Sequence, residues 1–247
     1  MVKTTDSNEY GPADAESIAM LWNTPLGQAH AQLLLDRLDI PDRGTLLDLG
    51  CGWGELLLRA LSMTPNATGV GVDNYLPDLE RARTAALDRG LDAQATFVEG
   101  SAIEWTGQAS RVVCVGATHA WGGTARALAA LRENVEPGGR LLLGDGFWKQ
   151  EPTDRAIEMF GDQVLALGDI VRQVHSAGWE VLHLTEADQL EWDDFESTWR
   201  LGRHWWLTEH SNAAQASELR DELRSSLLEY VEVYRQVLGF CYLVLQS

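Results

Sequence analysis

Short apolar runs alternate with amphipathic segments along most of the chain. In the amphipathic segments, leucine and alanine recur every three or four positions, which is the period of a helix with one buried face. The run 111–115 is apolar at nearly every position, as in a parallel strand that helices cover on both faces. The pattern predicts strands over residues 45–49, 68–72, 95–99, 111–115, 140–143, 180–184 and 240–245.

Helices are predicted in the intervals between these strands. Pro77 in the first turn and Gly90 after the last turn favour a helix over residues 77–89. Pro25 divides the helical pattern near the start of the chain into two helices. The remaining helices are predicted at about 55–62, 124–135, 154–177, 192–208 and 213–238.

Strands that alternate with helices predict an α/β fold, in which a parallel sheet carries helices on both faces. The chain shows no low-complexity linker and no internal repeat, and its 247 residues suit one large domain. We therefore expect a single domain over residues 1–247. Its parts are a flexible tail at 1–12, N-terminal cap helices at 13–40, a core sheet at 45–186, cap helices at 187–238 and a last strand at 239–247.

Glycines are concentrated where the first strand passes into the following helix. Gly50, Gly52 and Gly54 allow the backbone to approach a ligand closely, because no Cβ stands in the way. The helix that follows directs its free N–H groups at whatever lies over the turn. Asp73, at the end of the second strand, has the spacing at which a βαβ unit presents a carboxylate to a ribose diol. The pattern predicts a ligand that carries a nucleoside.

The glycine spacing distinguishes between nucleoside ligands. The dinucleotide fingerprint G-x-G-x-x-G requires a third glycine where this chain has Glu55. A pyrophosphate would also meet Asp48 and Glu55 and would find no basic residue in the turn. The acidic residue followed by G-x-G-x-G instead resembles motif I of the class I S-adenosylmethionine-dependent methyltransferases.

The resemblance extends beyond motif I, from about Asn23 to the C-terminus, and is greatest to one bacterial subgroup of these methyltransferases. It implies a Rossmann-like, seven-stranded, mostly parallel doubly wound sheet with an antiparallel last strand and a helical cap. It also implies S-adenosyl-L-methionine as cofactor and S-adenosyl-L-homocysteine as product, but no particular acceptor. The residues that carry the resemblance are 113–118, Gly122-Gly123, 142–148, Trp192-Asp193, Trp206-Leu207, Tyr230, Tyr234 and Gly239-Phe240.

The cofactor-binding residues are expected at several strand ends, because parallel strands bring their carboxyl ends to one edge of the sheet. Asp48 is expected to accept from the cofactor ammonium, and Asp73 from both ribose hydroxyls, with a helix N-cap as the alternative for Asp73. In the methyltransferases an acidic residue after the third strand holds the adenine amino group. Ser101 stands there in this chain and can still accept a hydrogen bond. The expected set is Asp48, Gly50, Cys51, Gly52, Gly54, Asp73, Asn74, Ser101, Ala102, Ile103 and Gly116.

Methyl transfer needs an aligned nucleophile and, where that nucleophile carries a proton, a base. Histidine exchanges protons near neutral pH, which makes His119 the first candidate, although it could merely bond the backbone of a glycine-rich loop. Asp145, after the fifth strand, is the second candidate, and His204 in the cap is the third. Four tryptophans are expected to line the substrate pocket, with packing of the cap on the sheet as the alternative: Trp22, Trp121, Trp148 and Trp206.

Charge narrows the range of acceptors. The formal net charge is −18, from 19 basic and 37 acidic side chains. Such a surface repels phosphate backbones and anionic membranes, so neither nucleic acid nor a membrane is an expected partner. Ten tryptophans favour a small aromatic or amine-bearing acceptor. The alternatives are methylation of a protein or peptide, a protein that binds S-adenosylmethionine without transferring methyl, and a nicotinamide oxidoreductase.

The three cysteines predict a reduced, cytoplasmic protein. Cys51, Cys114 and Cys241 are far apart and lie in apolar or glycine-rich surroundings, which suits neither a disulfide framework nor a metal site. Asp145 stands alone near the ends of the fourth and fifth strands, so no catalytic metal is expected. The sequence shows no signal peptide, and no apolar stretch approaches the roughly 20 residues that a membrane span needs.

Overall fold

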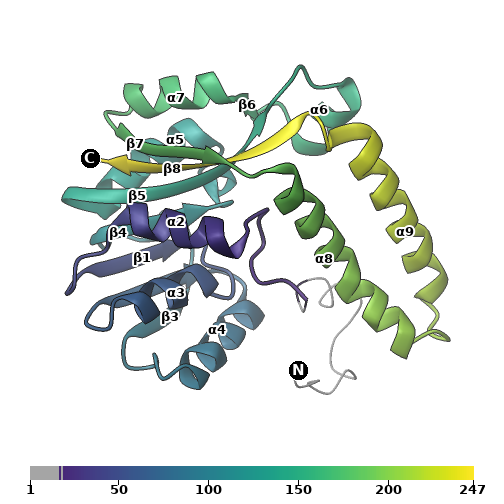
Figure 1. Cartoon of the computed structure of the whole chain (residues 1–247), viewed down its shortest axis with the longest axis horizontal. Helices are drawn as coiled ribbons and strands as arrows, with labels where there is room; N and C mark the ends of the chain where they lie inside the picture. Colours follow the sequence, from purple (N-terminus) through teal and green to yellow (C-terminus); the bar gives the residue numbers. More distant parts are fainter. Residues whose placement is uncertain (1–16, 18) are drawn as a thin grey trace.

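The computed structural model of the chain describes residue 17 and residues 19–247, and Figure 1 shows a central sheet flanked by helices. The strands are β1 (Thr45–Leu49), β2 (Thr68–Asp73), β3 (Ala95–Glu99), β4 (Ala109–Val115), β5 (Val135–Trp148), β6 (Leu165–Ala166), β7 (Glu180–Glu186) and β8 (Leu238–Gln246). The α-helices are α2 (Gln28–Leu38), α3 (Glu55–Met63), α4 (Leu76–Asp88), α5 (Thr124–Leu131), α6 (Asp154–Phe160), α7 (Leu167–Ser176), α8 (Gln189–Glu209) and α9 (Ala216–Glu229). Shorter turns are η1 (Ala102–Glu104), η2 (Thr118–Trp121), η3 (Arg132–Asn134) and the π-helical η4 (Tyr230–Tyr234).

The sheet has the strand order β3-β2-β1-β4-β5-β8-β7, and β6 pairs with the end of β5. Strands β1 to β5 are parallel to one another, whereas β8 is antiparallel to both β5 and β7. This confirms the predicted doubly wound sheet with seven strands in its main path and an antiparallel last strand. The sequence pattern does not predict β6, because two residues are too few to show a period.

Two apolar clusters cover the two faces of the sheet. Val113 of β4 belongs to one cluster, whereas Val112 and Cys114 belong to the other, because successive residues of a strand point to opposite faces. The first cluster includes side chains of α2, α3 and α4, and the second includes side chains of α5 and α7. Because helices cover both faces, a ligand can reach the sheet at the strand ends.

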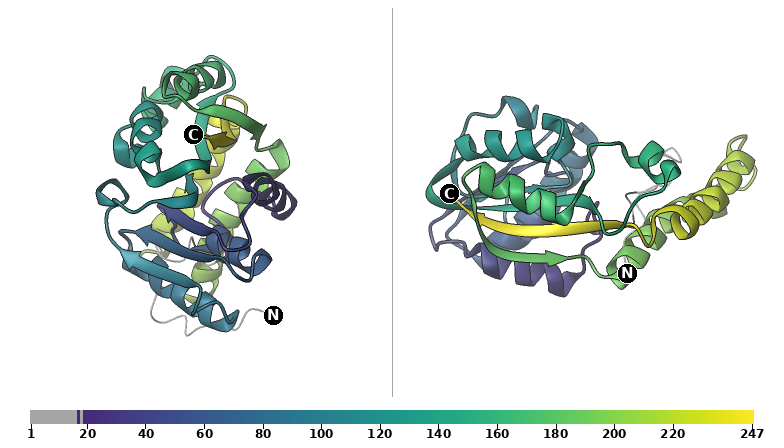
Figure 2. Two further views of the ribbon diagram at one scale, coloured as in Figure 1. Left: turned by 90° about the vertical axis from the view of Figure 1, so that its left-hand side faces the viewer. Right: turned by 90° about the horizontal axis from the view of Figure 1, so that it is seen from above.

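Helices α8 and α9 form a cap that projects beyond the carboxyl ends of the parallel strands (Figure 2). A capping box begins α8, since the Asp188 carboxylate accepts from the Glu191 N–H at 2.9 Å and the Glu191 carboxylate accepts from the Asp188 N–H at 2.9 Å. Helix α9 passes into the π-helical turn η4, so the predicted helix over 213–238 is divided. In the described part of the chain, no helix is long and apolar enough to cross a membrane.

Glycines with positive φ explain two other departures from the predicted elements. Gly161, at φ 85°, ends α6, so the helix predicted over 154–177 is two helices. Gly138, at φ 76°, lies in an irregular stretch of β5 where the pairing register with β4 shifts, and β5 therefore begins at Val135 rather than at residue 140. Of the predicted N-terminal cap helices, the second is α2. The first is not a helix over residues 19–25, which form turns and bends, and the tail 1–12 with residues 13–16 and 18 lies outside the described residues.

Candidate active site at the strand ends

The predicted ligand-binding segments lie at the carboxyl ends of neighbouring strands, in the order β3, β2, β1, β4 and β5 (Figure 1). Backbone hydrogen bonds join them beyond the strands. The Gly50 N–H donates to the Val72 carbonyl at 2.9 Å, and the Gly100 N–H donates to the Asp73 carbonyl at 2.9 Å. The Gly116 N–H donates to the carbonyl of Gly144 at 2.9 Å. The segments are thus held side by side along one edge of the sheet.

The glycine turn between β1 and α3 needs glycine for two different reasons. Gly50, Gly52 and Gly54 all have positive φ, at 78°, 50° and 69°. A Cβ on Gly50 would overlap the side chain of Ala117, and one on Gly54 would overlap the ring of Phe97. At Gly52 the nearest atom among the described residues to such a Cβ is an Asp78 carboxylate oxygen at 3.7 Å, so there is more room there than at Gly50 or Gly54.

Open space also lies over the end of β4. Gly116 has φ 72° and is exposed, and a Cβ placed on it would have no atom of the described residues within 4 Å. The turn at Gly52 and the strand end at Gly116 therefore leave backbone that a ligand can approach closely.

Asp73 ties the glycine turn to the end of β2. Its Oδ2 accepts from the Gly52 N–H at 2.8 Å, and its Oδ1 accepts from the Tyr75 N–H at 2.9 Å. The N-cap residue of α4 is Tyr75 rather than Asp73, so the carboxylate supports the turn and not the cap position. Each carboxylate oxygen retains a further lone pair, which can accept a hydroxyl of a bound ligand.

Three carboxyl groups lie close to the turn, those of Asp48, Asp73 and Asp78. Asp48 is 3% exposed, and burial followed by the charge of Asp73 raises its pKa to about 7. Burial, followed by the negative charge of Asp73, also raises the pKa of Asp78, while the positive charge of Arg81 lowers it. This arrangement favours a ligand with positive charge over one that carries phosphates.

The carboxyl group of Asp48 makes stability depend on pH. Folding raises its pKa from 3.8 to about 7, so the unfolded chain loses this proton at lower pH than the folded chain. The contribution of Asp48 to the free energy of unfolding should therefore fall as the pH rises from about 4 to about 7. Asp48→Asn should unfold like the parent near pH 4 and be more stable by about 1–4 kcal/mol near pH 8.

Urea unfolding of both proteins across this pH range measures the effect, with replacement of the exposed Asp88 by asparagine as the control. A stability difference that does not change with pH would contradict the raised pKa of Asp48 in the folded protein.

Asp145, the second candidate base, makes hydrogen bonds that hold the loop carrying His119, the first candidate base. Its Oδ2 accepts from the hydroxyls of Thr118 at 2.8 Å and Thr124 at 2.6 Å, and its Oδ1 accepts from the Gly146 N–H at 2.9 Å. Burial raises the pKa of Asp145, while the two threonine hydroxyls oppose that rise. The carboxylate thus fixes η2 and α5 against β5, and the exposed His119 follows Thr118 directly.

Two of the predicted pocket tryptophans lie at strand ends. Trp121 is half-buried in η2, after β4. Trp148, at the end of β5, meets the ring of Phe160 edge-on at 6.1 Å between centroids, and Phe160 meets Tyr234 edge-on at 4.9 Å. An aromatic series therefore leads from the end of β5 to the cap.

The other two pocket tryptophans and His204 have different surroundings. Trp22 lies against α3, with the Arg59 guanidinium 4.7 Å from its ring centroid, and its indole N–H donates to the Leu26 carbonyl. Trp206 is buried between α8 and α9 and stacks on His210 at 4.5 Å. His204 is exposed on α8. The structure thus gives Trp206 a place in the apolar contact of the cap helices, where the sequence predicted a place in the substrate pocket.

Cys51, predicted at the turn for its small size, is a half-buried free thiol. Burial and then the charges of Asp48 and Asp73 raise the pKa of the Cys51 thiol. A thiol that holds its proton is a poor nucleophile. Its backbone N–H donates to the Val72 carbonyl at 3.1 Å, so Cys51 contributes through its backbone.

Sequence reasoning missed a segment that packs on the turn. Residues 19–27, here called the strap, line a groove together with α8. The Leu21 carbonyl accepts from the Trp53 indole N–H at 2.6 Å, and the Met20 carbonyl accepts from Arg81 at 2.8 Å. The position of Trp53 between two glycines was the available signal. The groove is lined by Met20, Leu21, Trp22, Thr24, Leu26, Glu191, Asp194, Phe195 and Thr198.

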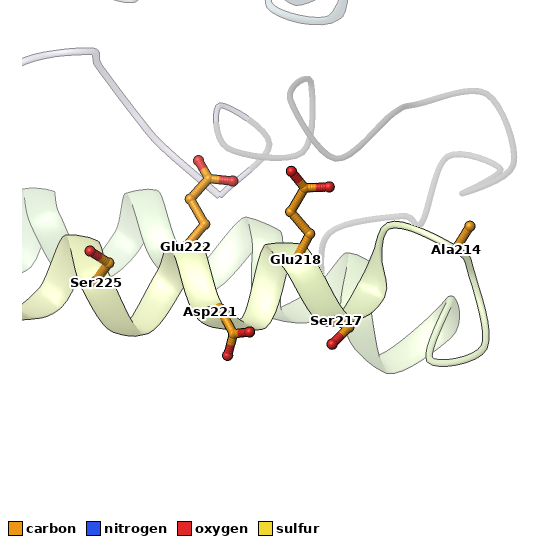
Figure 3. A pocket seen from close by; sticks show the side chains of 6 residues that line it. All are labelled: Ala214, Ser217, Glu218, Asp221, Glu222 and Ser225. Carbon is orange, nitrogen blue, oxygen red and sulfur yellow. The ribbon is translucent and has the colours of Figure 1, made fainter.

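A shallow acidic depression lies on α9, where Figure 3 shows Glu218 and Glu222 projecting from one side and Asp221 from the other. Arginines neutralise part of this charge: Arg203 pairs with Glu222 at 2.9 Å, and Arg224 pairs with Asp221 at 3.1 Å. The depression belongs to the cap and not to the strand ends.

Known proteins match both the sequence and the fold. The family described as "Methyltransferase domain" matches residues 46–139. The uncharacterized protein YjhP of Escherichia coli is 30% identical over 202 residues, which cover 79% of this chain and 81% of that protein.

Two crystal structures of S-adenosylmethionine-dependent methyltransferases, both in complex with S-adenosyl-L-homocysteine, are each 26% identical to this chain. The structure of the Geobacter sulfurreducens protein superposes with a TM-score of 0.87, and the match covers 95% of this chain and 96% of that protein. The structure of the Thiobacillus denitrificans protein also superposes with a TM-score of 0.87, and the match covers 95% of this chain and 97% of that protein.

Proposed function

Because the chain belongs to the class I S-adenosylmethionine-dependent methyltransferases, we propose that it methylates a small aromatic or amine-bearing molecule. The carboxyl groups of Asp73 and Asp78 beside the glycine turn suit a cofactor that carries an ammonium group. The observation that supports this acceptor class is the pair Trp121 and Trp148 after β4 and at the end of β5. When bound, S-adenosylmethionine would supply an activated methyl group, which passes to a nucleophilic atom of the acceptor as the bond from methyl to sulfur breaks and S-adenosylhomocysteine leaves. The residues of the chain hold the cofactor and orient the acceptor.

The cofactor residues have separate tasks along the edge of the sheet. Asp48 would accept from the ammonium of the cofactor, and the free lone pairs of Asp73 would accept from the ribose hydroxyls. Asn74 is exposed directly after Asp73. Ile103 is 53% exposed in η1 and offers an apolar surface to the adenine ring. Ser101 and Ala102 precede it, and Ser101 can accept from the adenine amino group.

His119 takes the proton of the acceptor in this proposal. It lies in η2 after β4 and is exposed, so a proton that it accepts can pass to bulk water. Asp145 holds this loop through Thr118 and is a positioning residue. Trp121 and Trp148 would supply apolar surface on either side of an aromatic acceptor.

The charge distribution favours a small acceptor over a macromolecule. A net charge of −18 disfavours nucleic acid and anionic membranes as partners. The acidic depression on α9 is the feature that would suit a basic peptide, but its ion pairs with Arg203 and Arg224 reduce that attraction.

The test is product formation from S-adenosylmethionine with a panel of phenols, anilines, aliphatic amines and one lysine-rich peptide. Mass spectrometry should detect a methylated small molecule and S-adenosylhomocysteine in equal amounts. Methylation of the peptide alone would favour a protein methyltransferase. Calorimetric binding of S-adenosylmethionine with no product from any acceptor would support a non-catalytic binding protein.

A further inference from the structure

We propose that Trp53 and Arg81 are positioning residues that hold the strap, residues 19–27, against the glycine turn, and that cofactor affinity depends on this contact. The inference rests on the proposed function, because it assigns two residues to the same cofactor site. Neither residue is expected to touch the reacting atoms.

Side chains, rather than a neighbouring strand, satisfy several strap carbonyls. The Leu21 carbonyl accepts from the indole N–H of Trp53 at 2.6 Å, and the Met20 carbonyl accepts from Arg81 at 2.8 Å. Arg81 also donates to the Ser17 carbonyl at 2.8 Å. Buried backbone carbonyls need partners, so loss of these donors would leave this part of the strap without its anchors on the turn.

Trp53 and Arg81 also lie at the proposed cofactor site, Trp53 in the glycine turn and Arg81 on α4. Trp53 stands between Gly52 and Gly54, and its ring is 7% exposed. The Arg81 guanidinium lies 4.3 Å from the centroid of that ring, and its charge acts on Asp78. Because Trp53 is part of the turn itself, a ligand that fixes the turn also fixes the anchor of the strap. Thermodynamic linkage then requires the strap contact to raise ligand affinity in return.

The opposite end of the strap has separate anchors. The fully buried Tyr242 donates to the Pro25 carbonyl at 2.9 Å, and the Gly27 N–H donates to the Glu191 carboxylate at 2.7 Å. These anchors come from β8 and α8, not from the glycine turn. Loss of the Trp53 and Arg81 contacts should therefore loosen residues 19–22 and leave residues 24–27 in place.

Two variants remove the anchors with little change of shape. Trp53→Phe keeps an aromatic ring and loses the indole N–H, and Arg81→Met keeps most of the chain length and loses the donors. Arg83→Met is the matched control, because Arg83 lies on the same helix and donates to the Phe97 carbonyl at 2.8 Å, away from the strap. Arg81→Lys retains the charge but not the guanidinium fork, and it replaces Arg81→Met if that variant fails to fold.

Calorimetry with S-adenosylhomocysteine and hydrogen exchange of the whole protein give the readouts. Trp53→Phe and Arg81→Met should each raise the Kd about tenfold, with a change of less than about twofold for Arg83→Met. Amides of residues 19–22 should exchange faster in the two variants, while those of residues 24–27 keep their parent rates.

The two proposals can fail separately. A folded parent protein that does not bind S-adenosylhomocysteine would overturn the proposed function. Normal binding by the parent, with the same Kd and the same exchange at residues 19–22 in both Trp53→Phe and the Arg81 variant, would overturn this inference alone.

Discussion

Asp73→Ala is expected to weaken the binding of S-adenosylmethionine by about 1–3 kcal/mol, which is roughly 5-fold to 150-fold in Kd. The substitution removes the carboxylate assigned to the ribose hydroxyls. It also removes the acceptor for the Gly52 N–H, so the turn loses a support at the same time. Calorimetry with S-adenosylmethionine and S-adenosylhomocysteine measures the change.

Asp88→Ala is the matched control, because Asp88 is an exposed carboxylate at the end of α4. It removes the same charge from the surface, so it separates a local contact from general electrostatic attraction. Asp73→Asn retains an oxygen that can accept from the Gly52 N–H and should bind more tightly than Asp73→Ala. Unchanged affinity in Asp73→Ala would remove the ribose role from Asp73.

His119→Ala is expected to lower turnover by about 100-fold or more while the Kd of S-adenosylmethionine stays nearly unchanged. General bases contribute on this scale when the nucleophile must lose a proton during the reaction. The measurement is kcat and KM with the acceptor that the panel identifies, as a function of pH.

His175→Ala provides the control, because His175 is an exposed histidine in the last turn of α7. His204→Ala tests the third predicted base in the same assay. Full activity in His119→Ala would exclude His119 from the mechanism, and a loss confined to His204→Ala would move the proton transfer to the cap.

The fold was predictable because each strand and helix depends on residues that are close in sequence. Strand β3 matches its predicted bounds, and α3 and α4 match theirs within one residue. The departures occur where backbone conformation overrides hydrophobic pattern. Gly161 ends a helix that the apolar period would continue, and Gly138 permits an irregular start to β5.

The candidate site, like the fold, has features that the sequence predicts and features that it does not. The conformation of the glycine turn and the place of Asp73 at the end of β2 were predictable, because a strand–turn–helix unit depends on a short segment of sequence. The hydrogen bonds of Asp145 to Thr118 and Thr124 were not predictable, because they join residues 27 and 21 positions apart. A carboxylate at a strand end can act as a base or as an anchor, and its neighbours decide between these roles.

By itself, the sequence determined the alternation of strands and helices, the glycine turn and the acidic character of the site, because these follow from local period, φ preference and charge. Tertiary structure decided which groups lie against that turn. The strap reaches Trp53 across 32 residues and Glu191 across 164 residues, and no local pattern encodes such pairings. Burial likewise decided the pKa of Asp48, because desolvation depends on the elements that close around the residue.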